Sequence, residues 1–98
     1  MRKTILTLGL TCNKVGNFAP IERETVIETI KLIMDVEGIP AYTLVDCTGY
    51  WEGKPEKSLQ IIVINDSFPV QNVCNWLKSN LLQDCIAVEI SYPEFSLL

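Results

Sequence analysis

Apolar residues recur along several segments of the chain with the period of a β-strand. Near the N-terminus, Leu6, Leu8 and Leu10 alternate with polar or small residues, and an alternation of period two is typical of a strand with one buried face. Other segments are rich in β-branched and aromatic residues, which also favours strands. The predicted strands are residues 3–12, 41–51, 57–65 and 85–92.

Two further segments show the period of an amphipathic helix. The first follows Pro20, a residue suited to the first turn of a helix, and ends before Gly38. The second begins at Pro69, with Asp66 or Ser67 as the expected N-cap. The apolar positions that share a helix face are Val26, Ile27, Ile30, Ile33 and Met34 in the first helix, and Val70, Val73, Cys74, Leu77 and Leu81 in the second.

The order of elements is therefore strand, helix, strand, strand, helix, strand, with residues 13–20 as a polar loop and a turn at Gly53 and Pro55. This order predicts an α+β, ferredoxin-like βαββαβ fold, in which two helices cover one face of a four-stranded antiparallel sheet. The length of 98 residues suits one core, so we expect residues 1–98 to form a single domain.

The first residues imitate a secretory signal, because Arg2 and Lys3 precede an apolar run. That run is short and contains two threonines, so a strand is the preferred interpretation. No other segment approaches the ~20 apolar residues of a membrane span. The four cysteines form no Cys-x-x-Cys pair. We expect a cytoplasmic protein with free thiols, in which Cys74 and Cys85 are buried.

The charge of the chain argues against nucleic acid as a partner. There are 12 acidic against 8 basic residues, a formal net charge of −4, and no basic run, whereas contacts to phosphates need a basic surface. An anionic membrane surface is disfavoured for the same reason.

Residues that commonly carry catalysis are also missing. The chain has no histidine, the usual acid or base near neutral pH, and no nucleotide-binding glycine motif or GxSxG motif. Glu52 and Glu56 flank a predicted surface turn, where acids are ordinarily solvated. We therefore expect no enzyme and no cofactor. We expect no metal site either, because copper(I) prefers clustered soft ligands; three copies of Cys12 around a trimer axis are the one exception.

The segment 57–65 carries aliphatic residues on both faces of its predicted strand. Leu59, Ile61 and Val63 alternate with Gln60, Ile62 and Ile64, and a strand that is apolar on both faces is usually buried on both. One interpretation is that Ile62 and Ile64 are singly exposed, which is common. We favour the other, a sheet that packs on a second subunit of a homo-oligomer.

Tyr50-Trp51-Glu52-Gly53-Lys54 resembles the CutA family, small ferredoxin-like trimers related in architecture to the PII signalling proteins. In that family a YWEGK-like segment enters a long hairpin, which here joins residues 41–51 to 57–65. Thr11-Cys12-Asn13 is similar to the family's TCP-like segment at the end of the first strand. Leu77-Lys78-Ser79 is similar to an LKS-like stretch in its second helix.

The resemblance implies a homotrimer whose hairpins cross to a neighbouring subunit and whose intersubunit clefts bind small ligands. Tyr50 and Trp51 would then stack on a base, and Lys54 and Lys57 would meet phosphate or carboxylate. Alternatively, the aromatic residues fix the hairpin on its neighbour and the lysines keep an exposed edge soluble. The candidate ligand-binding residues are Thr11, Asn13, Tyr50, Trp51, Glu52, Lys54 and Lys57.

The function expected from these observations is non-catalytic binding of a small anionic ligand, such as a nucleotide or a nucleotide-derived signal. Such a protein acts as a sensor, or as a sponge of the kind that viruses use against host immune signals. The alternative is a protein–protein interaction module that docks through the hairpin or a sheet edge, with Trp51 as an anchor.

Overall fold

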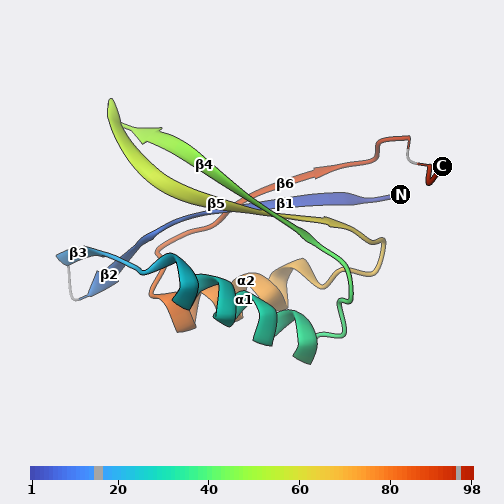
Figure 1. Ribbon diagram of the computed structural model, residues 1–98, viewed down its shortest axis with the longest axis horizontal. Coiled ribbons are helices and arrows are strands. Elements are labelled where there is room, and N and C mark those ends of the chain that lie inside the picture. The colour runs from blue at the N-terminus through green and yellow to red at the C-terminus, as the bar shows by residue number, and fades with distance from the viewer. Residues whose placement is uncertain (15–16, 95) are drawn as a thin grey trace.

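The computed structural model describes residues 1–14, 17–94 and 96–98. These residues form an α+β protein with two helices and a four-stranded antiparallel sheet, as predicted. Both helices lie on the same side of the sheet (Figure 1). The elements are β1 (Lys3–Gly9), β2 (Thr11–Lys14), β3 (Asn17–Pro20), α1 (Arg23–Val36), β4 (Thr43–Trp51), β5 (Lys54–Ile64), α2 (Val70–Leu81) and β6 (Ala87–Ser91).

The strands of the sheet follow the order β4-β5-β1-β6, and every neighbouring pair is antiparallel. β1 is an inner strand, with Leu6 opposite Ile61 of β5 on one side and Val88 of β6 on the other. The alternation near the N-terminus is therefore that of a strand, as predicted.

The core lies between the sheet and the two helices. Leu6 and Leu8 of β1 are at most 1% exposed, and Leu59, Ile61 and Val63 of β5 are fully buried. The predicted helix faces meet them, because burial in a helix follows the 3.6-residue period. Full burial of one such aliphatic side chain stabilises the fold by roughly 1.5–3 kcal/mol. The helix residues buried in the core are Val26, Ile30, Ile33 and Met34 of α1, and Val73, Cys74, Leu77 and Leu81 of α2.

Residues 13–14 and 17–20 of the predicted polar loop belong instead to a two-stranded ribbon, in which β2 pairs with β3; residues 15–16 of that loop lie outside the described residues. The first strand ends early, at Gly9, because the chain turns at Leu10. The Leu10 N–H donates to the Lys57 carbonyl (2.8 Å), and the Leu10 carbonyl accepts from the Ile21 N–H (2.8 Å). Pairing within the ribbon then satisfies backbone groups that a loop leaves to water. Pro20 consequently lies in β3 and not in the first turn of a helix.

The second helix and the last strand also differ from the prediction at their ends. α2 begins at Val70, and its N-cap position, Pro69, makes no side-chain capping bond in the described part of the chain. Asp66, an expected cap, accepts a hydrogen bond from the Arg2 backbone N–H instead (2.5 Å). Cys85 is exposed and precedes β6, so the prediction that it is buried is wrong. Cys74 is buried, as predicted.

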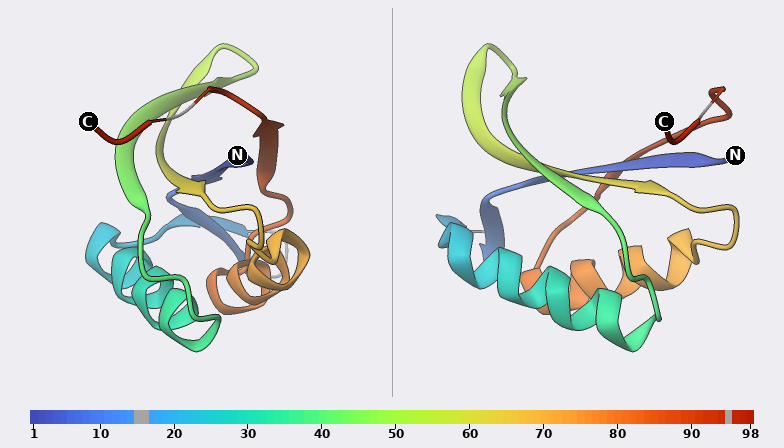
Figure 2. Two further views of the ribbon diagram at one scale, coloured as in Figure 1. Left: turned by 90° about the vertical axis from the view of Figure 1, so that its right-hand side faces the viewer. Right: turned by 45° about the vertical axis from the view of Figure 1, so that its right-hand side comes forward.

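β4 and β5 form a long hairpin whose turn consists of Glu52 and Gly53. Both residues have positive φ angles, 50° and 77°, as a two-residue turn that matches the twist of the strands requires. β1 ends opposite Ser58, so the first residues of β5 pair with β4 alone. Pro55 lies in this segment, which tolerates a residue without an N–H. Figure 2 shows the hairpin curving away from the helices.

The sheet face that points away from the helices is partly apolar. Ile62 and Ile64 are half-buried, and Ile62 lies opposite Ile5 of β1. The homo-oligomer stays a prediction. Neither helix in the described residues is long and apolar enough to cross a membrane. A cytoplasmic location stays a prediction as well.

Candidate functional site

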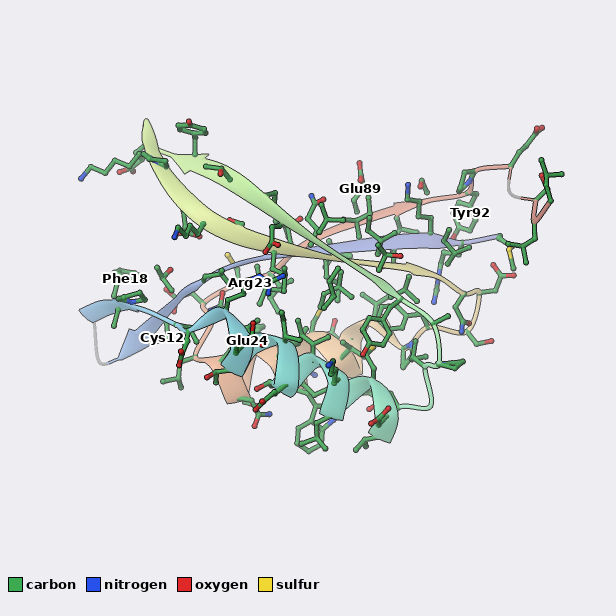
Figure 3. The ribbon with its side chains drawn as sticks, viewed as in Figure 1. Cys12, Phe18, Arg23, Glu24, Glu89 and Tyr92 are labelled. Atoms are coloured by element: carbon green, nitrogen blue, oxygen red, sulfur yellow. The ribbon has the colours of Figure 1, made fainter. Side chains whose placement is uncertain are left out.

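A cleft of about 750 Å³ opens beside the point where the chain leaves the sheet at the end of β1. One wall comes from this turn, the ribbon and the start of α1, and the other comes from the β4–β5 hairpin. Figure 3 shows Arg23 between the helix layer and the strands. The lining residues are Leu10, Thr11, Pro20, Ile21 and Arg23 on the first wall, and Asp46, Cys47, Thr48, Pro55, Glu56, Lys57 and Ser58 on the second.

Glu56 is one of the lining residues, and its carboxylate lies beside Gly9 at the end of β1. A Cβ built on Gly9 would lie 1.8 Å from Glu56 Oε1 and 2.7 Å from its carboxyl carbon. The carboxylate therefore occupies the space that any side chain at position 9 would need. The hydroxyl of Thr11 donates a long hydrogen bond to Glu56 Oε2 (3.4 Å). Glu56 is thus a half-buried acid held across the end of β1, and the prediction of a solvated turn residue is wrong for it.

Thr11 is itself held from the opposite side. The side-chain amide of Gln83 donates to the Thr11 carbonyl (2.6 Å). Gln83 follows Leu82, which ends α2 with a left-handed backbone (φ 51°), and the Gln83 N–H donates back to the Lys78 carbonyl (3.1 Å). This C-terminal turn of α2 therefore fixes the ribbon, and with it the position of Thr11 in the cleft.

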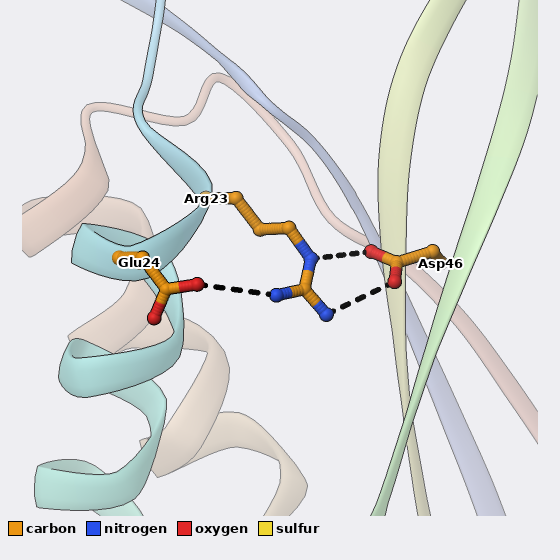
Figure 4. A network of polar contacts seen from close by, with 3 residues as sticks. All are labelled: Arg23, Glu24 and Asp46. Carbon is orange, nitrogen blue, oxygen red and sulfur yellow. Dashed lines mark hydrogen bonds and ion pairs between the residues drawn. The ribbon is translucent and has the colours of Figure 1, made fainter.

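Arg23 and Asp46 join the two walls of the cleft (Figure 4). Arg23 Nε donates to Asp46 Oδ1 (2.7 Å) and Arg23 Nη2 donates to Asp46 Oδ2 (2.9 Å), a bidentate pair. Arg23 Nη1 donates to Glu24 Oε1 (3.3 Å). The hydrogen bonds from Arg23 lower the pKa of Asp46 and raise that of Arg23. Their side chains are 60% and 45% exposed, respectively.

The formal charges that line the cleft balance. Arg23 and Lys57 are basic, whereas Asp46 and Glu56 are acidic. A site for a polyanion such as a nucleoside phosphate needs an excess of positive charge, which these residues do not supply. Apolar side chains such as Ile21 contribute surface for a ring system. The lining therefore suits an organic ligand that is neutral overall or carries charges of both signs.

The predicted binding residues fall into three groups in the structure. Thr11 and Lys57 line the cleft. Tyr50, Glu52 and Lys54 lie at the exposed end of the hairpin, outside the described lining. Asn13 belongs to β2 and Trp51 to β4, but their side chains lie outside what the structure describes. The structure therefore does not bring the predicted set together in one place.

The prediction missed Gly9, Arg23 and Gln83, and it set aside the nearby carboxylates of Asp46 and Glu56 because acids near a surface turn are ordinarily solvated. One signal was available for Arg23. It lies in the first turn of α1, where the helix dipole disfavours a positive charge, so a partner outside the helix was to be expected. Gly9 and Gln83 gave no local signal, because each acquires its role from a residue distant in the sequence, Glu56 and Thr11 respectively.

No cysteine cluster accompanies the cleft. All four cysteines are free thiols, and the described residues contain no group of three or more Cys, Asp or Glu side chains that could hold a metal ion. Cys47 lines the cleft, whereas Cys12 is buried in the ribbon and is not among the described lining residues.

No model of a known protein family matches the chain, and no curated protein matches it either. Two similar solved structures are those of a phage SAM (S-adenosylmethionine) lyase. The structure in the apo state has a TM-score of 0.71 at 25% sequence identity and covers 92% of this chain and 78% of that one. The complex with S-methyl-5′-thioadenosine has a TM-score of 0.66 at 25% identity, covering 92% of this chain and 79% of that one.

These structures contradict the prediction that the chain is not an enzyme, since the similar protein is a lyase. The prediction rested on the absence of histidine and of catalytic sequence motifs, and on the interpretation of the turn acids as solvated. Absence of histidine does not exclude acid–base chemistry, because carboxylates, lysine, tyrosine and cysteine can also act as acids or bases. The similar structures are not CutA or PII proteins, so the CutA resemblance stays a prediction, and the sensor and sponge roles have no support. The ligand in the complex is a nucleoside without a phosphate.

Proposed function

We propose that this chain is a phage-encoded enzyme that binds S-adenosylmethionine (SAM) in the cleft that Glu56 lines and releases S-methyl-5′-thioadenosine. The observation that carries the proposal is the structural match over 92% of the chain to a phage SAM lyase, including a complex with this nucleoside. The volume of the cleft, about 750 Å³, lies within the ~300–1,000 Å³ of small-molecule sites.

The chemistry of the proposed reaction suits a site without histidine. S-methyl-5′-thioadenosine retains the adenosine, the sulfur and the methyl group of SAM, so the bond that breaks joins sulfur to the amino acid side chain. Its electron pair goes to the positively charged sulfur, which leaves as a neutral thioether and takes up no proton. The leaving group therefore requires no general acid.

The four-carbon fragment must receive an electron pair at the carbon that loses sulfur. Attack by its own carboxylate closes a lactone, with no proton transferred to the protein. Removal of a proton from the neighbouring carbon gives an alkene, and the proton passes to a base. The lactone and the alkene have the same mass, so the sample is first hydrolysed with alkali. Mass spectrometry then distinguishes the products, because the lactone takes up one water to give a hydroxy amino acid and the alkene does not.

In this proposal Glu56 holds the sulfonium by charge attraction. The carboxylate is half-buried, lies against Gly9 and has one oxygen near the Thr11 hydroxyl. Charge attraction of this kind is strongest in the bound substrate, because the positive charge on sulfur disappears as the bond breaks. It therefore lowers KM and does not raise kcat. Leu10, Ile21 and the two prolines of the lining offer an apolar surface to the adenosine.

The direct test is incubation of the purified protein with SAM, followed by chromatography with mass detection. We expect S-methyl-5′-thioadenosine to accumulate without added cofactor. S-adenosylhomocysteine is the matched control: its sulfur is uncharged and would leave as a poorly stabilised thiolate, so it should not be cleaved. Absence of the nucleoside product from SAM, with protein that is folded by circular dichroism, would overturn the proposal.

We also propose that the enzyme is a homo-oligomer, with a trimer as the expected form, and that its main sheet is a ferredoxin-like one to which the ribbon is added. The half-buried Ile62 and Ile64, on the sheet face without helices, support the oligomer. The strand order β4-β5-β1-β6 supports the fold. Light scattering at micromolar concentration tests the oligomer, and a mass of 11.0 kDa, that of one chain, would contradict it.

A further inference from the structure

The ion pair between Arg23 and Asp46 spans the cleft but contributes little to the stability of the folded protein. The two side chains are 45% and 60% exposed, and ion pairs in that environment add little to stability. They come from different elements, α1 and β4, and both line the cleft that also contains Glu56. A binding role in the cleft accounts for their position better than a structural one.

Both partners retain capacity for further hydrogen bonds. A guanidinium has five N–H donors, and the bonds to Asp46 and Glu24 use three of them. The third of these is long, at 3.3 Å to Glu24, and can be given up to a better acceptor. Each Asp46 oxygen accepts one hydrogen bond from Arg23 and has a further lone pair. While the ion pair stays intact, Arg23 can therefore donate a hydrogen bond to a ligand anion, and Asp46 can accept one from a ligand cation.

One class of ligand group complements such a pair, namely an α-amino acid end with its ammonium and carboxylate on one carbon. We propose that Arg23 and Asp46 bind the amino acid end of the substrate, the carboxylate on Arg23 Nη1 and the ammonium on Asp46. This inference rests on the proposed function, because it assigns a second part of the same cleft. It also predicts that the nucleoside product, which lacks the amino acid, makes no use of the pair.

Calorimetric titration with two uncleaved ligands tests the assignment. S-adenosylhomocysteine carries the amino acid end, and S-methyl-5′-thioadenosine lacks it. For the wild type we expect both to bind, with S-adenosylhomocysteine at least about tenfold tighter, since hydrogen bonds to charged groups carry that much preference. Relative to the wild type, Arg23→Gln and Asp46→Asn should each raise the Kd for S-adenosylhomocysteine about tenfold. The Kd for S-methyl-5′-thioadenosine should change by less than about twofold.

Two further variants serve as controls. Asp35→Asn removes the same charge from an exposed position of α1 that does not line the cleft, and should change neither affinity. Arg23→Lys keeps the charge but not the bidentate geometry, and should give an intermediate loss for S-adenosylhomocysteine only. Unfolding midpoints of all variants should stay close to that of the wild type, because the pair is exposed.

The outcomes separate this inference from the proposed function. If the wild type binds S-methyl-5′-thioadenosine but shows no preference for S-adenosylhomocysteine, the proposed function stands and the amino acid subsite is overturned. Equal losses for both ligands in Arg23→Gln and Asp46→Asn would also overturn it, by showing a structural role. If the wild type binds neither ligand and does not cleave SAM, both the proposed function and the amino acid subsite are overturned.

Discussion

The carboxylate of Glu56 lies against the backbone of Gly9, so closely that a Cβ at position 9 would come within 1.8 Å of Oε1. The contact joins the free part of the hairpin to the last residue of β1. The size of the residue at position 9 therefore affects the orientation of the Glu56 carboxylate. A glycine in a strand ordinarily weakens it, and this contact is a physical reason for one here.

Replacing Gly9 with alanine should change substrate binding without weakening the fold. The clashing atoms are the far end of a flexible side chain, so Glu56 can rotate away at small cost. Alanine also loses less backbone entropy on folding than glycine, by roughly 0.5–1 kcal/mol. We expect an unfolding free energy within about 1 kcal/mol of the wild type, together with a raised KM for SAM. Denaturant titration and steady-state kinetics measure the two quantities.

The background variant Glu56→Ala shows whether the effect passes through the acid. If Gly9→Ala acts by displacing the carboxylate, it adds nothing to KM once Glu56 has been removed. An additional increase in that background would mean that residue 9 contacts the ligand by another route.

Glu56→Gln should raise KM for SAM about tenfold, since hydrogen bonds and contacts to charged groups carry roughly that preference, and should not lower kcat. The neutral amide loses the attraction to the sulfonium, which is present in the bound substrate and fades in the transition state. Glu52→Gln removes the same charge from the exposed hairpin turn and should be silent. A fall in kcat at constant KM would contradict the electrostatic role and indicate that Glu56 takes up a proton.

Thr4→Val should stabilise the protein by about 1 kcal/mol. Thr4 is fully buried in β1, and among the described residues its hydroxyl has no hydrogen-bond partner. Valine removes the unpaired group and keeps the branched shape. Thr7→Val is the matched control, since the Thr7 hydroxyl accepts a hydrogen bond from Gln60 Nε2 (3.2 Å), so that variant should gain nothing. Thermal unfolding compares both, and a loss of stability in Thr4→Val would refute the prediction.

Glu52→Asn should stabilise the hairpin by about 0.5–1 kcal/mol. Glu52 has a left-handed backbone, φ 50°, a region that asparagine adopts more readily than glutamate. Glu52→Ala separates this cause from the loss of charge, because alanine has no such preference. Equal gains from both substitutions, measured by chemical denaturation, would assign the effect to charge instead.

The ion pair predicts a dependence of stability on pH with a definite sign. Hydrogen bonds from Arg23 lower the pKa of Asp46 in the folded state. The contribution of the pair is therefore complete above the pKa of Asp46 in the unfolded chain, about 3.9, and is lost as the pH falls through the lower folded value. The difference in unfolding midpoint between the wild type and Asp46→Asn, small at pH 7, should begin to shrink below about pH 4 and vanish below the folded pKa of Asp46. A difference that grows on acidification would contradict this assignment.

Part of the fold follows from the sequence because it depends on short-range periodicity. Val26, Ile30 and Met34 share a helix face whatever surrounds them, and Leu6 and Leu8 share a strand face for the same reason. Gly53 marks the hairpin turn because few other residues adopt its backbone conformation without cost. These rules placed the two helices and the four sheet strands.

The ribbon and the cleft depend on contacts between distant residues. The ribbon forms because backbone hydrogen bonds to Lys57 and Ile21 hold the turn at Leu10. No local sequence pattern predicts these bonds. In sequence Glu56 is an acid beside a turn, and only its contact with Gly9 makes it part of a site.

The contact between Arg23 and Asp46 could not be predicted from the sequence either. Each is an ordinary surface charge in its own segment, and only the folded chain brings Arg23 Nε within 2.7 Å of Asp46 Oδ1. The inventory of residue types determined that no histidine can act here. Whether the remaining carboxylates, guanidinium and hydroxyls form a site was decided by the tertiary structure, because hydrogen bonds and ion pairs depend on distances that the chain acquires only when it folds.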